Sequence, residues 1–229
     1  MNYASYEYIN EPRAVVRVKI GDAATPVWFQ NRWEASDEQF SEFIVRNGCG
    51  HCCAAMAITL GGHRIDPLEE YNLCRSLWGA PDEVRGPDGR KSGQANFQSV
   101  MGITKVIRHF GISAECFGVP DLESVGAHID GALRSGKQVI FCSRPSPDYP
   151  ENPFSRGYHW VMAVGYTENG SILVANSSEK YTPLGAQEVT LTTLLRALPK
   201  GASPKDFTWG EWGDEEGGFL GGTGYILIG

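Results

Sequence analysis

A cysteine, a histidine and an asparagine stand where they could together carry out nucleophilic catalysis. Cys49 lies between two glycines, directly before a stretch that predicts a helix. The partial positive charge and the backbone N–H groups of a helix N-terminus favour the thiolate, which is the reactive form of cysteine. His159 opens an apolar stretch that predicts a strand. Because the imidazole must meet the thiol in space and not in sequence, the 110 positions between them (159 minus 49) are compatible with a Cys-His pair.

Asn176 could be the third member of this group. Segments 159–166 and 171–176 read as strands that flank Asn169-Gly170, a strong signal for a tight hairpin. Pairing of the two strands would bring Asn176 within reach of His159, where an amide can hold the imidazole in the right tautomer. Taken singly, each residue also fits a structural role: a buried thiol, a histidine bonded to a loop carbonyl, and a turn asparagine. The hairpin favours the catalytic interpretation, since it joins His159 to Asn176.

The segment around Cys49 is compatible with two other kinds of chemistry. Cys49-Gly50-His51-Cys52 matches the redox motif of disulfide isomerases, in which the second thiol resolves a mixed disulfide. That motif normally sits in a βαβ thioredoxin pattern, which the flanking sequence lacks. A zinc site built from residues 49–53, including Cys53, would need a second, separated ligand pair, and none stands out. We therefore expect no metal and no organic cofactor.

The elements that must position these residues are helices in the first half and strands in the second. Residues 14–20 alternate as a strand, and helices are expected at about 50–60, from Asp66-Pro67, over 97–107, and from Asp121 to Gly136. Short apolar runs follow at 138–142, 159–166 and 171–176, then a helix near 190–198 and a strand near 223–228. Helices followed by mostly antiparallel strands predict an α+β fold.

We expect residues 1–229 to form a single domain. It would comprise an N-terminal strand extension (1–26), a helical half that carries Cys49 (27–135), and an antiparallel sheet half that carries His159 and Asn176 (136–229). With 41% hydrophobic and 11% aromatic residues, the chain can bury a full core. The uneven spacing of its six cysteines favours thiols over a disulfide framework.

Charge and hydropathy exclude several classes of partner. The net charge of −7, without a basic run, argues against nucleic acid as a partner. No apolar stretch is long enough to span a bilayer, and no signal peptide is visible. We therefore expect no membrane partner and a cytoplasmic location, unless a signal has been removed. The sequence does not indicate an oligomeric state.

At this point the sequence resembles a known family. Residues 47–56 (Asn-Gly-Cys-Gly-His-Cys-Cys-Ala-Ala-Met) resemble the nucleophile helix of the double-glycine leader peptidase-like branch of the papain-like cysteine peptidases. Residues 135–140, 159–166 and 172–176 are similar to its strand, base and third-member segments, so the resemblance spans about 27–178. It implies a papain-like fold and cleavage of peptide or isopeptide bonds through a Cys49-His159-Asn176 triad.

The resemblance also implies an oxyanion hole. Gln30, in Trp28-Phe29-Gln30, matches the glutamine that precedes the cysteine in the broader family and would donate together with the backbone N–H of Cys49. The chain departs from the branch at His51, where proline is usual, at Phe43, where leader peptidases have glutamine, and at Asn176, where aspartate is usual. These departures bear on double-glycine specificity.

A peptide or protein substrate is the expected partner. Two alternatives to a peptidase stay open, namely the thiol-disulfide oxidoreductase and a catalytically inactive peptide-binding module on the same fold.

Overall fold

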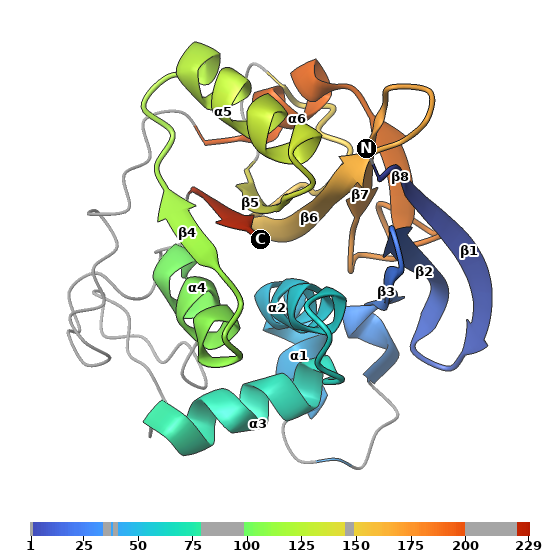
Figure 1. Ribbon diagram of the computed structural model, residues 1–229. Helices are drawn as coiled ribbons and strands as arrows, with labels where there is room; N and C mark the ends of the chain where they lie inside the picture. The colour runs from blue at the N-terminus through green and yellow to red at the C-terminus, as the bar shows by residue number, and fades with distance from the viewer. Residues whose placement is uncertain (1, 34–37, 39–40, 79–98, 145–148, 200–223) are drawn as a thin grey trace.

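The computed structural model describes residues 2–33, 38, 41–78, 99–144, 149–199 and 224–229 (Figure 1). Its helices are α1 (Ser41–Asn47), α2 (Cys49–Leu60), α3 (Pro67–Trp78), α4 (Val100–His109), α5 (Leu122–Arg134) and α6 (Leu191–Ala197), with a 3₁₀ helix η1 (Gln30–Trp33). Its strands are β1 (Ala4–Glu11), β2 (Ala14–Ile20), β3 (Ala23–Trp28), β4 (Ala114–Phe117), β5 (Gln138–Ser143), β6 (His159–Tyr166), β7 (Ile172–Ala175), β8 (Ala186–Val189) and β9 (Tyr225–Ile228). The predicted α+β class, with a helical half and an antiparallel sheet half, is confirmed.

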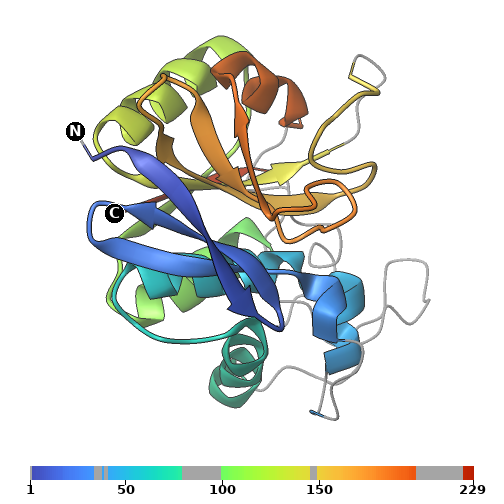
Figure 2. The same cartoon turned by 90° about the vertical axis from the view of Figure 1, so that its right-hand side faces the viewer.

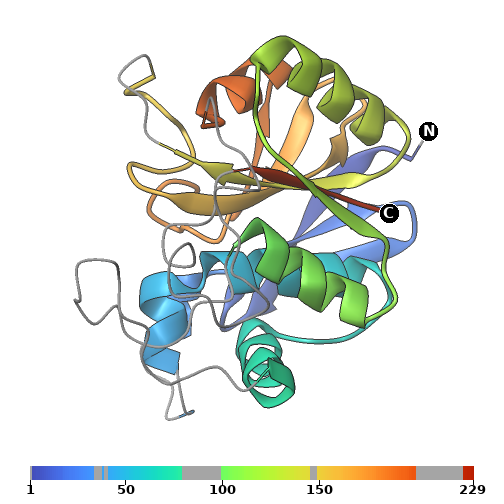
Figure 3. The same ribbon diagram turned by 90° about the vertical axis from the view of Figure 1, so that its left-hand side faces the viewer.

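A six-stranded antiparallel sheet forms the middle layer, in the order β4-β9-β5-β6-β7-β8. Helices α5 and α6 cover one face, and α2 and α4 cover the other (Figures 1 and 3). All eight residues of β6 are buried, because its side chains alternate between two cores. Trp160, Met162 and Val164 pack toward α2, whereas Val161 and Ala163 pack toward α5. The continuous apolar run that predicted this strand reflects burial on both faces.

A smaller sheet, in the order β1-β2-β3, leans on the large sheet and contacts β6 and β7 (Figure 2). Only its middle strand, β2, was predicted from the alternation of residues 14–20. That strand is buried on the face carrying Val16, Val18 and Ile20, as expected. β1 exposes most of its side chains, and β3 contains Pro26, so neither shows the period-2 pattern that would have revealed it.

The predicted helix starts are confirmed at α3 and α5. The Asp66 carboxylate accepts from the N–H groups of Leu68 and Glu69, and Glu69 accepts in return from the Asp66 N–H, all at 2.9 Å. This is the capping box that the sequence predicts. Asp121 accepts from the Ser124 N–H at 2.8 Å and caps α5 in the same manner. The start expected for α4 at residue 97 lies outside the described residues, and the described helix begins at Val100.

Helix α1 was not predicted. It directly precedes α2, and the two helix axes meet at a bend of 100°. At the corner, a Cβ on Gly48 would lie 2.4 Å from the Ile44 carbonyl oxygen and 2.8 Å from the Ile44 Cα. Only glycine fits this contact, and the corner sets Cys49 at the first position of α2. In the described residues no single helix is long and apolar enough to cross a bilayer, and α1 and α2 reach that length and composition only as this bent pair.

Candidate active site

Cys49 opens α2, which packs against β6, and its side chain is half-buried. The backbone N–H groups of Trp160, Gly50 and Cys49 itself lie close enough to its sulfur to favour the thiolate. The Trp160 N–H belongs to the peptide bond that joins His159 to Trp160. The thiol at the start of the helix therefore lies against the main chain of His159, although the two residues are far apart in sequence.

His159 begins β6, and Asn176 directly follows β7. His159 Nε2 lies 2.7 Å from Asn176 Oδ1. Met162 pairs with Ala175 in the strand register, so Asn176 continues opposite Val161 and stands diagonal to His159. Because Oδ1 can only accept, the neutral imidazole carries its proton on Nε2 and its lone pair on Nδ1. The basic nitrogen is thus Nδ1, the one nearer the main chain.

The orientation of the Asn176 amide is fixed by its other partners. Nδ2 donates to the Phe154 carbonyl oxygen at 3.1 Å and to Thr182 Oγ1 at 3.0 Å. Oδ1 accepts a second hydrogen bond, from the Ser178 N–H at 2.9 Å. Asn176 is fully buried and Thr182 nearly so. A flipped amide would lose these bonds, so the tautomer of His159 is set by the surroundings of Asn176.

Replacing Thr182 with valine should test this arrangement. The two side chains have the same shape, but valine leaves one buried N–H of Asn176 without an acceptor, which we expect to cost about 1–3 kcal/mol of unfolding free energy. Thr182→Ser keeps the hydroxyl and should lose clearly less. Urea unfolding of both variants measures the difference. Equal stability of the two variants would show that the hydroxyl does not hold Asn176.

Burial dominates the charge states of Cys49 and His159. It raises the pKa of the Cys49 thiol, and the three backbone N–H groups offset this only in part. It lowers the pKa of His159 to about 4, against the opposing effect of the Asn176 hydrogen bond. Both groups are therefore neutral at pH 7. This differs from the thiolate expected from the helix N-terminus, because the cost of removing a charge from water exceeds the local attraction of the helix end.

The lowered pKa of His159 predicts a loss of stability in acid. The unfolded chain binds a proton at the ordinary pKa of 6.5, whereas the folded chain binds it only near 4. Stability therefore falls as the pH drops from 6.5 to 4, by about 3 kcal/mol. Urea unfolding between pH 7 and pH 4 should show that His159→Gln removes this part of the pH dependence, while the exposed His63→Gln does not. Parallel curves for wild type and His159→Gln would contradict the prediction.

Gln30 lies at the same end of α2. Its Nε2 donates to the Val45 carbonyl oxygen at 3.0 Å, and its Oε1 accepts from Ser177 Oγ at 3.3 Å. Val45 stands four residues before Cys49, and Ser177 follows Asn176. The Gln30 side chain is thus held between the segment that leads into Cys49 and the segment that leaves Asn176. An amide nitrogen has two protons, and Val45 engages one of them.

Comparison with known proteins gives a distant likeness to solved structures alone. No protein-family model matches the chain, and no curated protein matches it. Among solved structures, the chain is similar to a protein from Bacillus anthracis described as a candidate C39-like peptidase. The two are 15% identical with a TM-score of 0.41, over 80% of this chain and 88% of that one.

Within the 49–53 segment, His51 has its partners on α1 and α3. His51 is buried, pairs through Nδ1 with the Glu70 carboxylate of α3, and packs against the rings of Phe43 and Tyr71. In the described residues, no three His, Cys, Asp or Glu side chains are placed to hold a metal ion. Every strand pairing within the described ranges is antiparallel, so no βαβ unit flanks Cys49 there.

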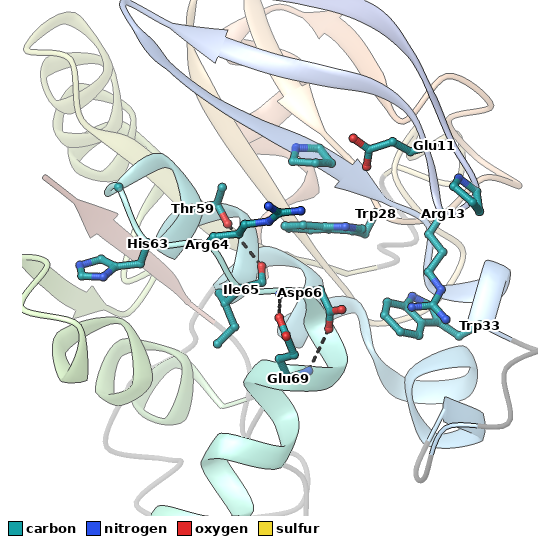
Figure 4. A pocket seen from close by; sticks show the side chains of 13 residues that line it. Glu11, Arg13, Trp28, Trp33, Thr59, His63, Arg64, Ile65, Asp66 and Glu69 are labelled. Atoms are coloured by element: carbon teal, nitrogen blue, oxygen red, sulfur yellow. Dashed lines mark hydrogen bonds between the residues drawn. The ribbon is translucent and has the colours of Figure 1, made fainter.

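A pocket of about 860 Å³ lies at the other end of α2 (Figure 4). It is lined by residues that include Trp28, Trp33, Thr59 and Asp66, with the Arg13 guanidinium 3.5 Å above the Trp33 ring. Thr59 follows Cys49 by ten residues, which is about 15 Å along a helix at 1.5 Å per residue. None of Cys49, His159 and Asn176 lines this pocket, so it is separate from the candidate active site.

Several residues of the site were not predicted from the sequence. The backbone N–H of Trp160, the Phe154 carbonyl and the Ser178 N–H act through main-chain atoms, which any residue type supplies. Ser177 and Thr182 act through hydroxyls in a loop whose course the sequence does not indicate. The two hydroxyl-bearing residues that directly follow Asn176, Ser177 and Ser178, are the signal of these contacts that the sequence carries.

Proposed function

We propose that the chain is a cysteine peptidase that hydrolyses peptide or isopeptide bonds, with Cys49 as nucleophile, His159 as general base and Asn176 as the residue that orients His159. The observation that supports this most directly is the contact of the Cys49 sulfur with the Trp160 N–H, next to a histidine whose Nε2 is engaged by Asn176. A thiol, a correctly tautomerised imidazole and an orienting amide are the parts that thiol acyl transfer needs.

The proposed reaction begins from a neutral pair. The Cys49 sulfur bonds to the scissile carbonyl carbon as its proton passes to His159 Nδ1. The carbon–nitrogen bond then breaks, the imidazolium returns the proton to the leaving amine, and a thioester remains on Cys49. Water, deprotonated by His159, cleaves the thioester and restores the thiol. Because His159 stays unprotonated down to about pH 4, it is available as a base throughout the neutral range.

The oxyanion of the intermediate would lie between two donors. One is the backbone N–H of Cys49, which belongs to the first turn of α2 and points along the positive end of the helix dipole. The other is the second proton of Gln30 Nε2. Gln30 is bonded to Val45, which lies four residues before Cys49. This link between the two donors supports their common role in binding the oxyanion.

Two departures from the double-glycine branch fall in the core. Phe43 stacks on Tyr71 with ring centroids 4.6 Å apart, and His51 pairs with Glu70. A glutamine at position 43 would be buried in this aromatic cluster, and Gln30 takes the place of the donor instead. We therefore propose membership of the papain-like group with a core that differs from the leader peptidases.

Two assays test the proposal. Wild type should cleave an unstructured fluorogenic peptide or an isopeptide-linked pair, Cys49→Ala should not, and Cys52→Ala should. Iodoacetamide near neutral pH should modify Cys49 faster than Cys116, which is also half-buried and serves as the matched thiol. No cleavage and no excess reactivity at Cys49 would favour the inactive binding module. Turnover of a disulfide substrate that requires Cys52 would favour the oxidoreductase.

A further inference from the structure

Four of the six cysteines gather around the start of α2. The charge that Cys49 would carry acts on the thiols of Cys52, Cys53 and Cys142, so all three lie within electrostatic range of it. Those three are buried, with exposed fractions of 0%, 0% and 1%, whereas Cys49 is half-buried. Within this cluster Cys49 is therefore the thiol that a dissolved oxidant can reach, and the others are placed to react with it afterwards.

We propose that Cys49 and Cys52 form a reversible disulfide when the protein meets a peroxide, and that this disulfide switches the Cys49 thiol off. The spacing of three residues within one helix places their Cα atoms about 5 Å apart. A disulfide spans Cα atoms about 4.4–6.8 Å apart. Side chains on a helix tilt toward its N-terminus, so Cys52 leans toward Cys49. The Cβ atoms of residues three apart on a helix lie about 5–6 Å apart and those of a disulfide about 3.5–4.5 Å, so the bond requires side-chain rotation and a small tightening of the first turn of α2.

Cys52 is also nearer to Cys49 along α2 than Cys53, with an axial rise of about 4.5 Å against about 6 Å. A thiol attacks as its thiolate, and the Ser177 hydroxyl is a hydrogen-bond partner of Cys52 that offsets a part of the effect of burial on the pKa of this thiol. Burial and the charge of Cys49 act against the thiolates of Cys52 and Cys53 alike, so position on the helix decides between them. Cys142 lies on β5 opposite Trp160, and its thiol donates to the Ser143 carbonyl oxygen at 3.8 Å. Linking Cys142 to Cys49 would join α2 to the sheet, whereas Cys52 lies on the same helical turn as Cys49.

The chemistry balances with a peroxide as the oxidant. The Cys49 sulfur attacks one peroxide oxygen, the O–O bond breaks, and an alcohol or water leaves, which gives the sulfenic acid Cys49–SOH. The Cys52 sulfur then attacks the Cys49 sulfur, the S–O bond breaks, and the hydroxide leaves as water with the Cys52 proton. Two thiols are oxidised by two electrons, and a dithiol reductant reverses the step by exchange. The disulfide also keeps Cys49 from the irreversible sulfinic acid.

The test maps the thiols of the whole chain after exposure to hydrogen peroxide. Remaining thiols are blocked with iodoacetamide in denaturant, the disulfide is reduced, and the released thiols are labelled with N-ethylmaleimide for tandem mass spectrometry. Trypsin cuts after Arg46, Arg64, Lys137 and Arg156 but not after Arg144, which precedes a proline, so Cys142 falls in a peptide apart from Cys49. We expect maleimide on Cys49 and Cys52 alone, and full return of iodoacetamide reactivity at Cys49 after dithiothreitol. Maleimide on Cys53 or Cys142 in place of Cys52, or no disulfide at all, would overturn the proposal.

Variants separate this proposal from the proposed function. Cys52→Ala should be oxidised at Cys49 to products that dithiothreitol restores poorly, whereas Cys53→Ala, the matched buried control, should behave as wild type. Recovery of Cys52→Ala equal to that of wild type would overturn the switch. The wild-type map needs no variant, so it decides the matter even if Cys52→Ala does not fold. Only the loss of peptidase activity on oxidation rests on the proposed function: a disulfide without any peptide cleavage supports the switch alone, and cleavage without a disulfide overturns the switch alone.

Discussion

Replacing His159 with glutamine should slow peptide hydrolysis by about 10²–10⁴-fold, the usual contribution of a positioned general base. Glutamine fills similar space and can still donate to Asn176 Oδ1, but it cannot accept the proton of the Cys49 thiol. Burial already raises the pKa of the Cys49 thiol. Without His159, no neighbouring base takes its proton at neutral pH in the proposed mechanism. The effect should therefore appear in the rate of the first chemical step. The measurement is kcat/KM on a fluorogenic peptide, with Cys49→Ala as the floor.

The control is His63→Gln, which removes an exposed histidine beside the pocket at the other end of α2. It should leave both hydrolysis and alkylation of Cys49 unchanged. Alkylation of Cys49 by iodoacetamide in His159→Gln should rise with pH, because only hydroxide can then form the thiolate. If His159→Gln hydrolysed the peptide at the wild-type rate, the pairing of Cys49 with His159 would have no catalytic role.

The parts of this fold that were predictable are those with local signals. α3 and α5 begin at aspartates whose side chains cap the first turn, and sequence alone identifies such residues. The β6–β7 hairpin turns at Asn169-Gly170, where Gly170 has a φ of +83°. Because asparagine and glycine favour such a turn, these two residues predicted the hairpin. Because that hairpin fixes the register, it also brought His159 and Asn176 together in the prediction.

What the sequence could not supply depends on contacts between distant segments. The approach of Cys49 to the Trp160 N–H follows from how α2 packs on β6, and a backbone donor leaves no mark in the sequence. The neutral state of the thiol is a consequence of burial, whereas the sequence shows only its place at a helix N-terminus. In the structure, Gly48 is required by the contact with Ile44 at the α1–α2 corner.

A second large effect is expected in the core, at Glu70. Its carboxylate pairs with His51 Nδ1 and accepts from Cys74 Sγ at 3.3 Å, and all three side chains are buried. Glu70→Ala would leave a buried histidine and a buried thiol without their acceptor, and we expect a loss of about 3–5 kcal/mol of unfolding free energy. Glu70→Gln keeps a carbonyl oxygen in place and should lose less. Urea unfolding at pH 7 measures both.

Two further variants show how much of the expected loss at Glu70 comes from the His51–Glu70 pair and how much from packing in the core. Glu42 forms an ion pair with Arg46 at 2.6 Å on the surface of α1, where both side chains are largely exposed, and Glu42→Ala should cost no more than about 0.5 kcal/mol. The double variant His51→Leu, Glu70→Leu replaces the buried pair by apolar groups and should be more stable than Glu70→Ala, because it leaves no buried polar group of this pair without a partner. If the double variant were the less stable of the two, the His51–Glu70 pair would itself be a net source of stability. His51 lies two residues from Cys49, so hydrolysis by the double variant also shows whether packing alone holds the nucleophile in place.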